Sequence, residues 1–184
     1  MTHNEQGIWT QETADASHES SVNLGKFLCE YLPKEFPVYD FGCGNGYYLG
    51  QLEKAGFVCL GFEGTQLNNF KCSSVQVHDL TTPIVLNEKG SVISLEVGEH
   101  LPRSAQETFM HTLTKNCHKH LVMSWAEIGQ PGIGHINCRN IDAVIRDVEN
   151  RGLHYLPGLT AKVRATIEEN TSWFQRTLLI FERQ

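Results

Sequence analysis

The segment Glu96-Val-Gly-Glu-His100 concentrates more acid–base side chains than any other loop of this 184-residue chain. It lies at the end of an apolar run, Ser91–Val97, that has the character of a buried strand. A histidine titrates near neutral pH, so His100 is suited to remove a proton from the hydroxyl group of a substrate. We predict that His100 is a general base and that Glu99 or Glu96 orients it. The alternative is that the glutamates cap a helix while His100 is a packed neighbour.

A second polar segment follows the next apolar run and extends from Ser124 to Asn137. Trp125 ends the expected strand, and a long glycine-rich loop follows, as in many functional lids. His135 and Asn137 alternate around Ile136, so both can point to one side. We predict that His135 is catalytic and that Trp125 and Asn137 bind the acceptor. The alternative is that His135 and Asn137 only satisfy loop backbone.

A glycine-rich turn near the start of the chain indicates a nucleotide-binding unit. The segment 38–46 reads Val-Tyr-Asp-Phe-Gly-Cys-Gly-Asn-Gly, and an expected helix and second strand lead from it to Glu63. A strand, glycine turn, helix and strand with an acid about 20 residues on can place helix amides on a polar ligand and the acid on ribose hydroxyls. An ordinary glycine turn in an α/β domain is the alternative.

The glycine spacing narrows the choice of ligand. A dinucleotide-binding fingerprint reads G-x-G-x-x-G, whereas Gly42, Gly44 and Gly46 read G-x-G-x-G. Asp40 stands two residues before the first glycine. An acid there would repel a pyrophosphate but attract a ligand that carries an ammonium group.

The motif from Asp40 to Gly46 resembles the first motif of the class I S-adenosylmethionine-dependent methyltransferases, an acid followed by x-G-x-G-x-G. The resemblance covers roughly residues 20–184, although only this motif is specific. It implies that S-adenosylmethionine is the cofactor and S-adenosylhomocysteine the product. It also implies that an E-x-x-E-H segment lies next to the transferred methyl group. The cofactor-binding residues expected from it are Asp40, Gly42, Cys43, Gly44 and Gly46 on the methionine side, Glu63 at the ribose, Asp79 and Leu80 at the adenine, and Glu96.

Asp79 and Leu80 follow the expected third strand, where the family carries an acid at the adenine amino group and an apolar side chain on the ring. A solvated turn residue is the alternative for Asp79. In both cases the positions fit the rule that open parallel sheets bind ligands at the carboxyl ends of their strands.

The elements needed to position these residues alternate between apolar strands and amphipathic helices. Strands are expected near residues 38, 57, 75, 91, 120, 153 and 173. Helices are expected around 24–32, after Gly46, at 65–71, from a capping box at Ser104-Ala-Gln-Glu107 to about His118, from Asn140 to Gly152, and at 159–170. We therefore predict an α/β Rossmann-like, doubly wound, mostly parallel seven-stranded sheet with helices on both faces. The resemblance implies that the last strand is antiparallel and lies between the fifth and sixth.

The chain length fits one compact domain at residues 20–184. Residues 1–19 are polar except for the Gly7-Ile-Trp9 segment, and we expect a flexible or lid-like N-terminal arm or a disordered tail. No apolar run approaches ~20 residues and no secretory signal is visible, so we expect a cytoplasmic protein without a membrane span.

Composition narrows the class of acceptor. The formal net charge is −6, and the 15 Lys and Arg residues form no cluster, which disfavours a long nucleic-acid substrate. The six cysteines form no C-x-x-C pair, so buried thiols are expected rather than disulfides. Among the nine histidines, His111, His118 and His120 lack a nearby carboxylate or cysteine, so no metal site is expected. The oligomeric state is left open.

Two substrate signatures are absent. The Asp/Asn-Pro-Pro-Tyr/Phe motif of base- and glutamine-modifying methyltransferases would stand where Glu96-Val-Gly-Glu99 stands, and no spaced Lys-Asp-Lys-Glu set is visible. We therefore expect methyl transfer to a small-molecule, lipid or sugar acceptor. The rival interpretations are a catalytically silent S-adenosylmethionine-binding regulatory module and a nicotinamide- or nucleotide-binding Rossmann protein.

Overall fold

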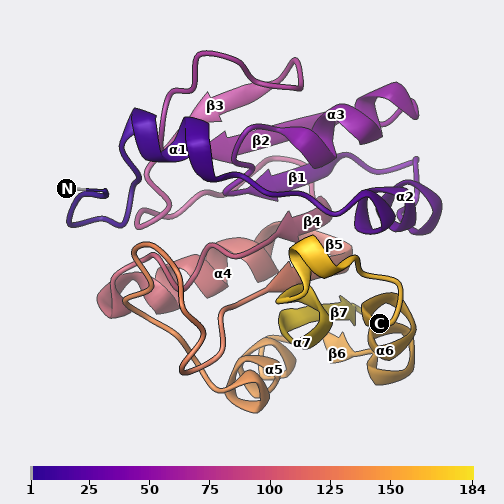
Figure 1. Cartoon of the computed structure of the whole chain (residues 1–184). Helices are drawn as coiled ribbons and strands as arrows, with labels where there is room; N and C mark the ends of the chain where they lie inside the picture. The colour runs from indigo at the N-terminus through magenta and orange to yellow at the C-terminus, as the bar shows by residue number, and fades with distance from the viewer. Residues whose placement is uncertain (1) are drawn as a thin grey trace.

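A computed structural model describes residues 2–184 as a seven-stranded sheet covered by helices on both faces (Figure 1). The predicted α/β Rossmann-like architecture is confirmed. The strands are β1 (Val38–Phe41), β2 (Cys59–Glu63), β3 (Val75–Val77), β4 (Gly90–Ser94), β5 (Cys117–Ser124), β6 (His154–Tyr155) and β7 (Leu178–Glu182). The helices are α1 (Gln11–Ser17), α2 (Val22–Tyr31), α3 (Tyr47–Lys54), α4 (Gln106–Asn116), α5 (Ile141–Glu149), α6 (Pro157–Arg164) and α7 (Phe174–Thr177), with 3₁₀ turns η1 (Arg103–Ala105) and η2 (Glu169–Thr171).

The sheet order is β3-β2-β1-β4-β5-β7-β6, and the chain reverses direction across the sheet between β1 and β4. Strands β1 to β5 pair in parallel, whereas β7 pairs antiparallel with both β5 and β6. The last strand therefore lies between the fifth and sixth, as predicted. The neighbouring carboxyl ends of β1 and β4 mark this switch point, where open α/β sheets bind their ligands.

Alternating side chains of the central strands divide the core into two layers. On β4, Val92 packs toward α4 and α5, whereas Ile93 packs toward α2, α3 and α6. On β5, Met123 and Val122 repeat this alternation. These side chains are fully buried, as expected of parallel strands covered on both faces.

Side-chain caps fix the first residues of helices α2 and α5. The Ser21 hydroxyl accepts a hydrogen bond from the Leu24 N–H and caps α2, and the Asn140 carboxamide accepts one from the Ala143 N–H and caps α5, as its sequence predicts. The predicted capping box at Ser104 does not form, because η1 precedes α4 and the Glu107 carboxylate accepts a hydrogen bond from Arg151 instead.

Other boundaries also differ from prediction. Residues 65–71 form bends rather than a helix, and the expected strand from Trp173 begins only at Leu178. The first turn of that segment is α7, in which the Thr177 hydroxyl donates to the Trp173 carbonyl. The helix expected to reach Asn170 ends at Arg164.

The six cysteines are free thiols, three of them buried, as their scattered spacing predicts. Within residues 2–184, no helix is both long enough and apolar enough to cross a membrane.

Candidate active site

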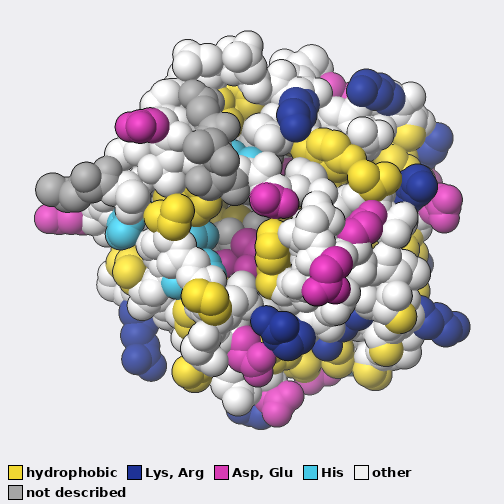
Figure 2. All heavy atoms as spheres, in the orientation of Figure 1, with side chains coloured by type: hydrophobic (Ala, Val, Ile, Leu, Met, Phe, Trp, Pro, Cys, Tyr) yellow, Lys and Arg dark blue, Asp and Glu magenta, His cyan; other side chains and the backbone are white. Residues whose placement is uncertain are grey.

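A cavity of about 460 Å³ opens at the carboxyl ends of the central strands. The glycine turn after β1, Glu63 at the end of β2, the loops after β4 and β5, and the N-terminal segment form its walls. Figure 2 shows this hollow, with acidic side chains inside it and histidines at its rim. The cavity size lies within the range typical of small-molecule sites.

The structure brings most of the predicted site residues to this cavity. Its walls include Asp40, Gly42, Cys43, Gly44, Glu63, Leu80, Glu96, His100 and His135. The remaining predicted residues are not among its walls: Gly46, Asp79, Glu99, Trp125 and Asn137.

The glycine turn is held directly against the acid that ends β2. The Gly44 N–H donates to Glu63 Oε2 over 2.8 Å, and the Thr65 N–H donates to Oε1 over 3.2 Å. Gly44 has a φ of +54°, and a Cβ there would lie 2.5 Å from the His18 ring. Only glycine fits this left-handed turn at such close approach. The turn and the Glu63 carboxylate are therefore positioned before any ligand binds.

Asp40 is 2% exposed at the base of the cavity, and its carboxylate has no hydrogen bond within the described residues. Burial, and secondarily the Glu63 carboxylate, raise the pKa of Asp40 to about 8. A cationic ligand group would favour its ionised form. The site thus contains a carboxyl that lacks only a positive partner.

The loop after β4 presents Glu96 in a strained conformation. Glu96 has a φ of +53° and is the only non-glycine residue with a positive φ among residues 2–184. Its Oε1 accepts a hydrogen bond from the Thr177 hydroxyl over 3.0 Å, and its Oε2 accepts one from the Gln130 side chain over 2.7 Å. Strain of this kind persists where surrounding contacts enforce it, often at functional sites.

Glu99 lies behind this wall and is completely buried. Among residues 2–184, neither carboxylate oxygen has a hydrogen-bond partner. Burial, with a further contribution from Glu96, raises the pKa of Glu99 well above its usual value. The Glu99 carbonyl accepts the N–H groups of Ile136 and Asn137, both over 2.9 Å, and so joins the loops after β4 and β5.

His100 and His135 lie side by side, with ring centroids 5.0 Å apart, although they are 35 positions apart in the chain. Burial first, and then His135, lower the pKa of His100 to about 4. The imidazole is therefore neutral at pH 7. This low proton affinity also makes it a weak general base, because proton transfer is most effective when the pKa lies near the operating pH.

Trp125 and Asn137 lie in the protein interior. Trp125 is fully buried, and its indole N–H donates to the Asn137 carbonyl over 2.7 Å. The Asn137 side chain donates to the Gly98 carbonyl over 3.4 Å. Gly98 is required here, because a Cβ would lie 2.3 Å from the Trp125 ring. Both side chains support the loops that carry Glu96 and His135, so contact with an acceptor would need them to move.

Leu80 reaches the cavity wall and is 5% exposed. The neighbouring Asp79 carboxylate accepts hydrogen bonds from the Thr81 N–H and the Thr81 hydroxyl, over 2.9 and 2.7 Å. Asp79 therefore stabilises a turn in this structure. Its predicted contact with adenine stays a prediction.

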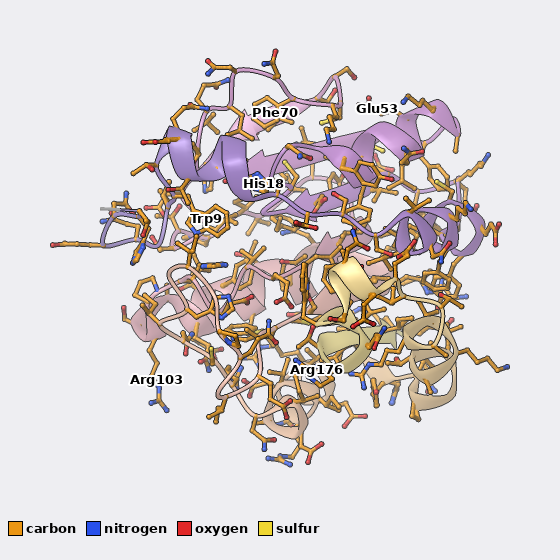
Figure 3. The ribbon with its side chains drawn as sticks, viewed as in Figure 1. Trp9, His18, Glu53, Phe70, Arg103 and Arg176 are labelled. Carbon is orange, nitrogen blue, oxygen red and sulfur yellow. The ribbon has the colours of Figure 1, made fainter. Side chains whose placement is uncertain are left out.

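The N-terminal segment contributes walls that the sequence did not specify. Trp9 and His18 lie next to each other, with ring centroids 5.6 Å apart (Figure 3). Trp9 also meets the edge of His100, and its carbonyl accepts a hydrogen bond from the Thr65 hydroxyl over 2.7 Å. In the sequence, only the Gly7-Ile-Trp9 segment indicates this contact, because it is the apolar part of an otherwise polar arm.

The C-terminal part of the chain supplies the opposite wall, which sequence reasoning missed. Trp173, Phe174 and Arg176 line the cavity from the η2–α7 region. This segment is far in sequence from the other walls and was predicted as strand. Only the position of β7 beside β5 brings it to the site.

Comparisons with solved structures identify the fold. A magnesium protoporphyrin IX methyltransferase from Synechocystis PCC 6803, crystallised with bound S-adenosylmethionine, is 18% identical and superposes with a TM-score of 0.60 over 95% of this chain and 79% of that chain. A TehB-like S-adenosylmethionine-dependent methyltransferase from Corynebacterium glutamicum gives 15% identity and a TM-score of 0.64 over 94% and 92% of the two chains. The cyclase SpnF gives 9% and 0.58 over 98% and 84%.

No protein-family profile and no curated protein sequence matches the chain. The seven-stranded sheet is that of the class I S-adenosylmethionine-dependent methyltransferases, so the fold implied by the motif from Asp40 to Gly46 is confirmed. A cyclase shares this architecture, so the fold alone does not determine the reaction.

Proposed function

We propose that the protein transfers a methyl group from S-adenosylmethionine to a small-molecule, lipid or sugar acceptor. The observation that carries the proposal is the unpaired, buried carboxyl of Asp40 beside the G-x-G-x-G turn. S-adenosylmethionine brings an ammonium group and a sulfonium, so an acidic cavity of this size complements it in charge.

The cofactor is oriented by the walls already described. Its methionine part lies along Gly42, Cys43 and Gly44 with the ammonium toward Asp40. Glu63 accepts hydrogen bonds from the ribose hydroxyls with the lone pairs that the Gly44 and Thr65 amides leave free. The adenine packs on Leu80, toward Asp79.

The same charges disfavour the nicotinamide alternative. Asp40, Glu63 and Glu96 all border the cavity near the turn. Ionised carboxylates here would repel a pyrophosphate, and the neutral Asp40 carboxyl would be kept from ionising beside one. The third glycine of the dinucleotide fingerprint is also misplaced.

Methyl transfer needs little covalent assistance from the protein. The acceptor atom attacks the methyl carbon in line with the breaking carbon–sulfur bond, and its lone pair forms the new bond. The electron pair of the carbon–sulfur bond stays on sulfur, which gives S-adenosylhomocysteine. The protein's task is to align the two reactants and exclude water. His100 and His135 border the cavity where the acceptor would lie, and Glu99 stands behind them.

The N-terminal arm is proposed as a lid. Trp9 covers His100 and Gly7 touches its carbonyl, since a Cβ at Gly7 would lie 1.9 Å from that oxygen. Opening of this segment would admit the cofactor, and closure would shield the reacting atoms.

Calorimetry with S-adenosylhomocysteine and, separately, NAD tests cofactor choice. We expect saturable binding of the first and none of the second. Glu63→Ala should weaken S-adenosylhomocysteine binding, while the exposed-loop control Glu88→Ala should not. Binding of NAD without S-adenosylhomocysteine would overturn the proposal.

His100→Ala is expected to spare cofactor binding and lower turnover, and the reverse pattern would mean that the roles are misassigned.

A further inference from the structure

The buried carboxyl of Glu99 is the least explained ionisable group near the site. It is 0% exposed, and neither oxygen has a hydrogen-bond partner among the described residues. An ionised carboxylate buried without partners is costly, and native proteins compensate such groups with cations, hydrogen bonds or metals. A bound cation would relieve this cost and let Glu99 ionise.

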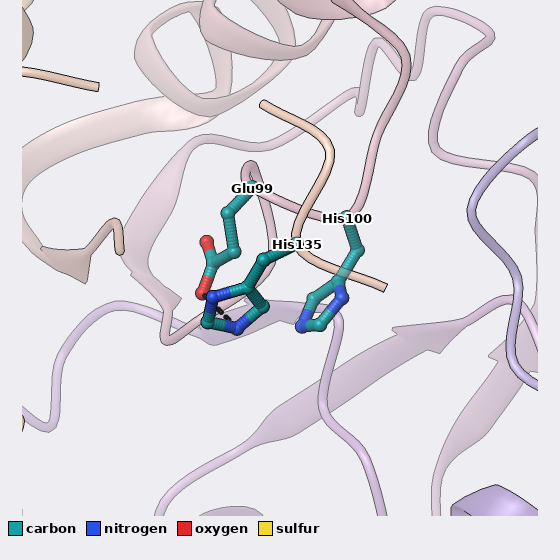
Figure 4. Close-up of side chains that lie close together, drawn as sticks. All are labelled: Glu99, His100 and His135. Carbon is teal, nitrogen blue, oxygen red and sulfur yellow. Dashed lines mark ion pairs between the residues drawn. The ribbon is translucent and has the colours of Figure 1, made fainter. Parts of the chain in front are cut away.

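Two histidines face this carboxylate. His135 Nε2 lies 4.0 Å from Glu99 Oε1. One ligand atom from each of Glu99, His100 and His135 can be chosen so that all three lie within 4.8 Å of one another (Figure 4). Small side-chain movements would bring three such atoms around a single ion.

The backbone favours the tautomer that a metal needs at His135 and permits it at His100. His135 Nδ1 lies 3.1 Å from the Gln130 carbonyl, which only accepts, so that nitrogen carries the proton and Nε2 keeps its lone pair. His100 Nδ1 lies 3.3 Å from the Gly134 carbonyl and 3.4 Å from the Trp9 indole nitrogen, and each tautomer satisfies one of these two contacts. Metal binding through His100 Nε2 selects the tautomer that donates to Gly134. Histidine ligands commonly have their second nitrogen held in this way.

We propose that Glu99, His100 and His135 bind a divalent transition-metal ion, with Zn²⁺ or Mn²⁺ as the fitting chemistry. Two imidazoles and one carboxylate suit such ions better than Mg²⁺ or Ca²⁺, which prefer oxygen ligands. Three protein ligands leave coordination positions open, and His100 and His135 also border the cavity. Glu96 lies close enough to add negative charge. This proposal replaces the sequence-based expectation of no metal.

This step rests on the proposed function. If the protein transfers a methyl group, a metal ion at this position implies that the acceptor is a hydroxyl compound. An acceptor oxygen bound at an open position has its pKa lowered, so its proton passes to water. The oxygen then forms a bond to the methyl carbon while the carbon–sulfur pair stays on sulfur. A metal-bound oxygen retains further lone pairs for this attack, whereas a metal-bound amine has none.

Metal titration of the full-length, chelator-treated protein tests the site. Zn²⁺ binding is measured by calorimetry, and Co²⁺ binding by its visible absorption band. We expect one saturable site. Glu99→Gln and His135→Asn should each weaken binding by more than about 100-fold, because loss of a direct ligand exceeds the effect of losing an outer partner. His111→Asn, at an exposed histidine of α4, should leave binding unchanged.

The absence of saturable binding, or equal loss in His111→Asn and Glu99→Gln, would overturn the metal site. His135→Asn provides a test on a loop side chain should Glu99→Gln fail to fold. S-adenosylhomocysteine binding is measured on the same metal-free protein. Cofactor binding without metal binding would refute only the metal, and metal binding without cofactor binding would refute only the proposed function.

Discussion

Binding of the cofactor should release a proton, because Asp40 must lose one to pair with an ammonium group. With the pKa of Asp40 at about 8, about nine-tenths of the carboxyls are protonated at pH 7 and about half at pH 8. The ligand's α-amino group is that of a free amino acid beside a carboxylate and stays protonated through this pH range. The net release therefore follows Asp40 alone and is about one proton at pH 6, about 0.9 at pH 7 and about 0.5 at pH 8.

Calorimetric titration with S-adenosylhomocysteine in buffers of different ionisation enthalpy measures this number. The slope of observed enthalpy against buffer enthalpy gives the protons released. Asp40→Asn should abolish the release at pH 6 and weaken binding at pH 8 by roughly 10- to 150-fold, the value of one hydrogen bond to a charged group. A slope near zero for the natural protein at pH 6 would refute the assignment of Asp40 to the ammonium.

Three further predictions concern stability and the lid. Gly98→Ala should lower the free energy of unfolding by about 1–3 kcal/mol in urea denaturation, since its Cβ overlaps the buried Trp125 ring, whereas Gly158→Ala, in open space on α6, should not lower it. Because folding raises the pKa of Asp40, the stabilisation by its protonated form is fully present below pH 4 and is lost as pH rises toward 8. The free energy of unfolding of Asp40→Asn, relative to that of the natural protein, should therefore rise by about 1.4 kcal/mol per pH unit between pH 5 and 7. A difference that does not change with pH would contradict the raised pKa. Trp9→Ala should speed S-adenosylhomocysteine dissociation roughly 2- to 13-fold in stopped-flow measurements, as loss of one aromatic pair predicts, and an unchanged rate would argue against a lid.

The fold was predictable because its signals are local. The apolar runs around Val38 and Val92, the glycine turn and the acid at Glu63 each report on a strand or turn through composition alone. Local signals failed at two element boundaries. Glu107 pairs with Arg151 instead of capping a helix, and the Trp173 segment turns as α7 before the last strand begins.

The site was predictable in part, for the same reason. Asp40 near the carboxyl end of β1 and His100 in the loop after β4 reach the cavity because parallel strands end at one edge. The roles of side chains in long loops depend on which face they turn inward. Trp125 turned into the core, and the pairing of His135 with Glu99 became visible only once the two loops were joined through backbone hydrogen bonds.

Transfer of an isotopically labelled methyl group from S-adenosylmethionine into a metabolite extract, with mass spectrometry of the products, tests the central claim most directly. The account predicts a labelled small molecule, heavier than its precursor by one methyl in place of hydrogen, and its loss in Asp40→Asn. Binding of the cofactor with no labelled product in any small-molecule, lipid or protein fraction would contradict it and favour a silent cofactor-binding module.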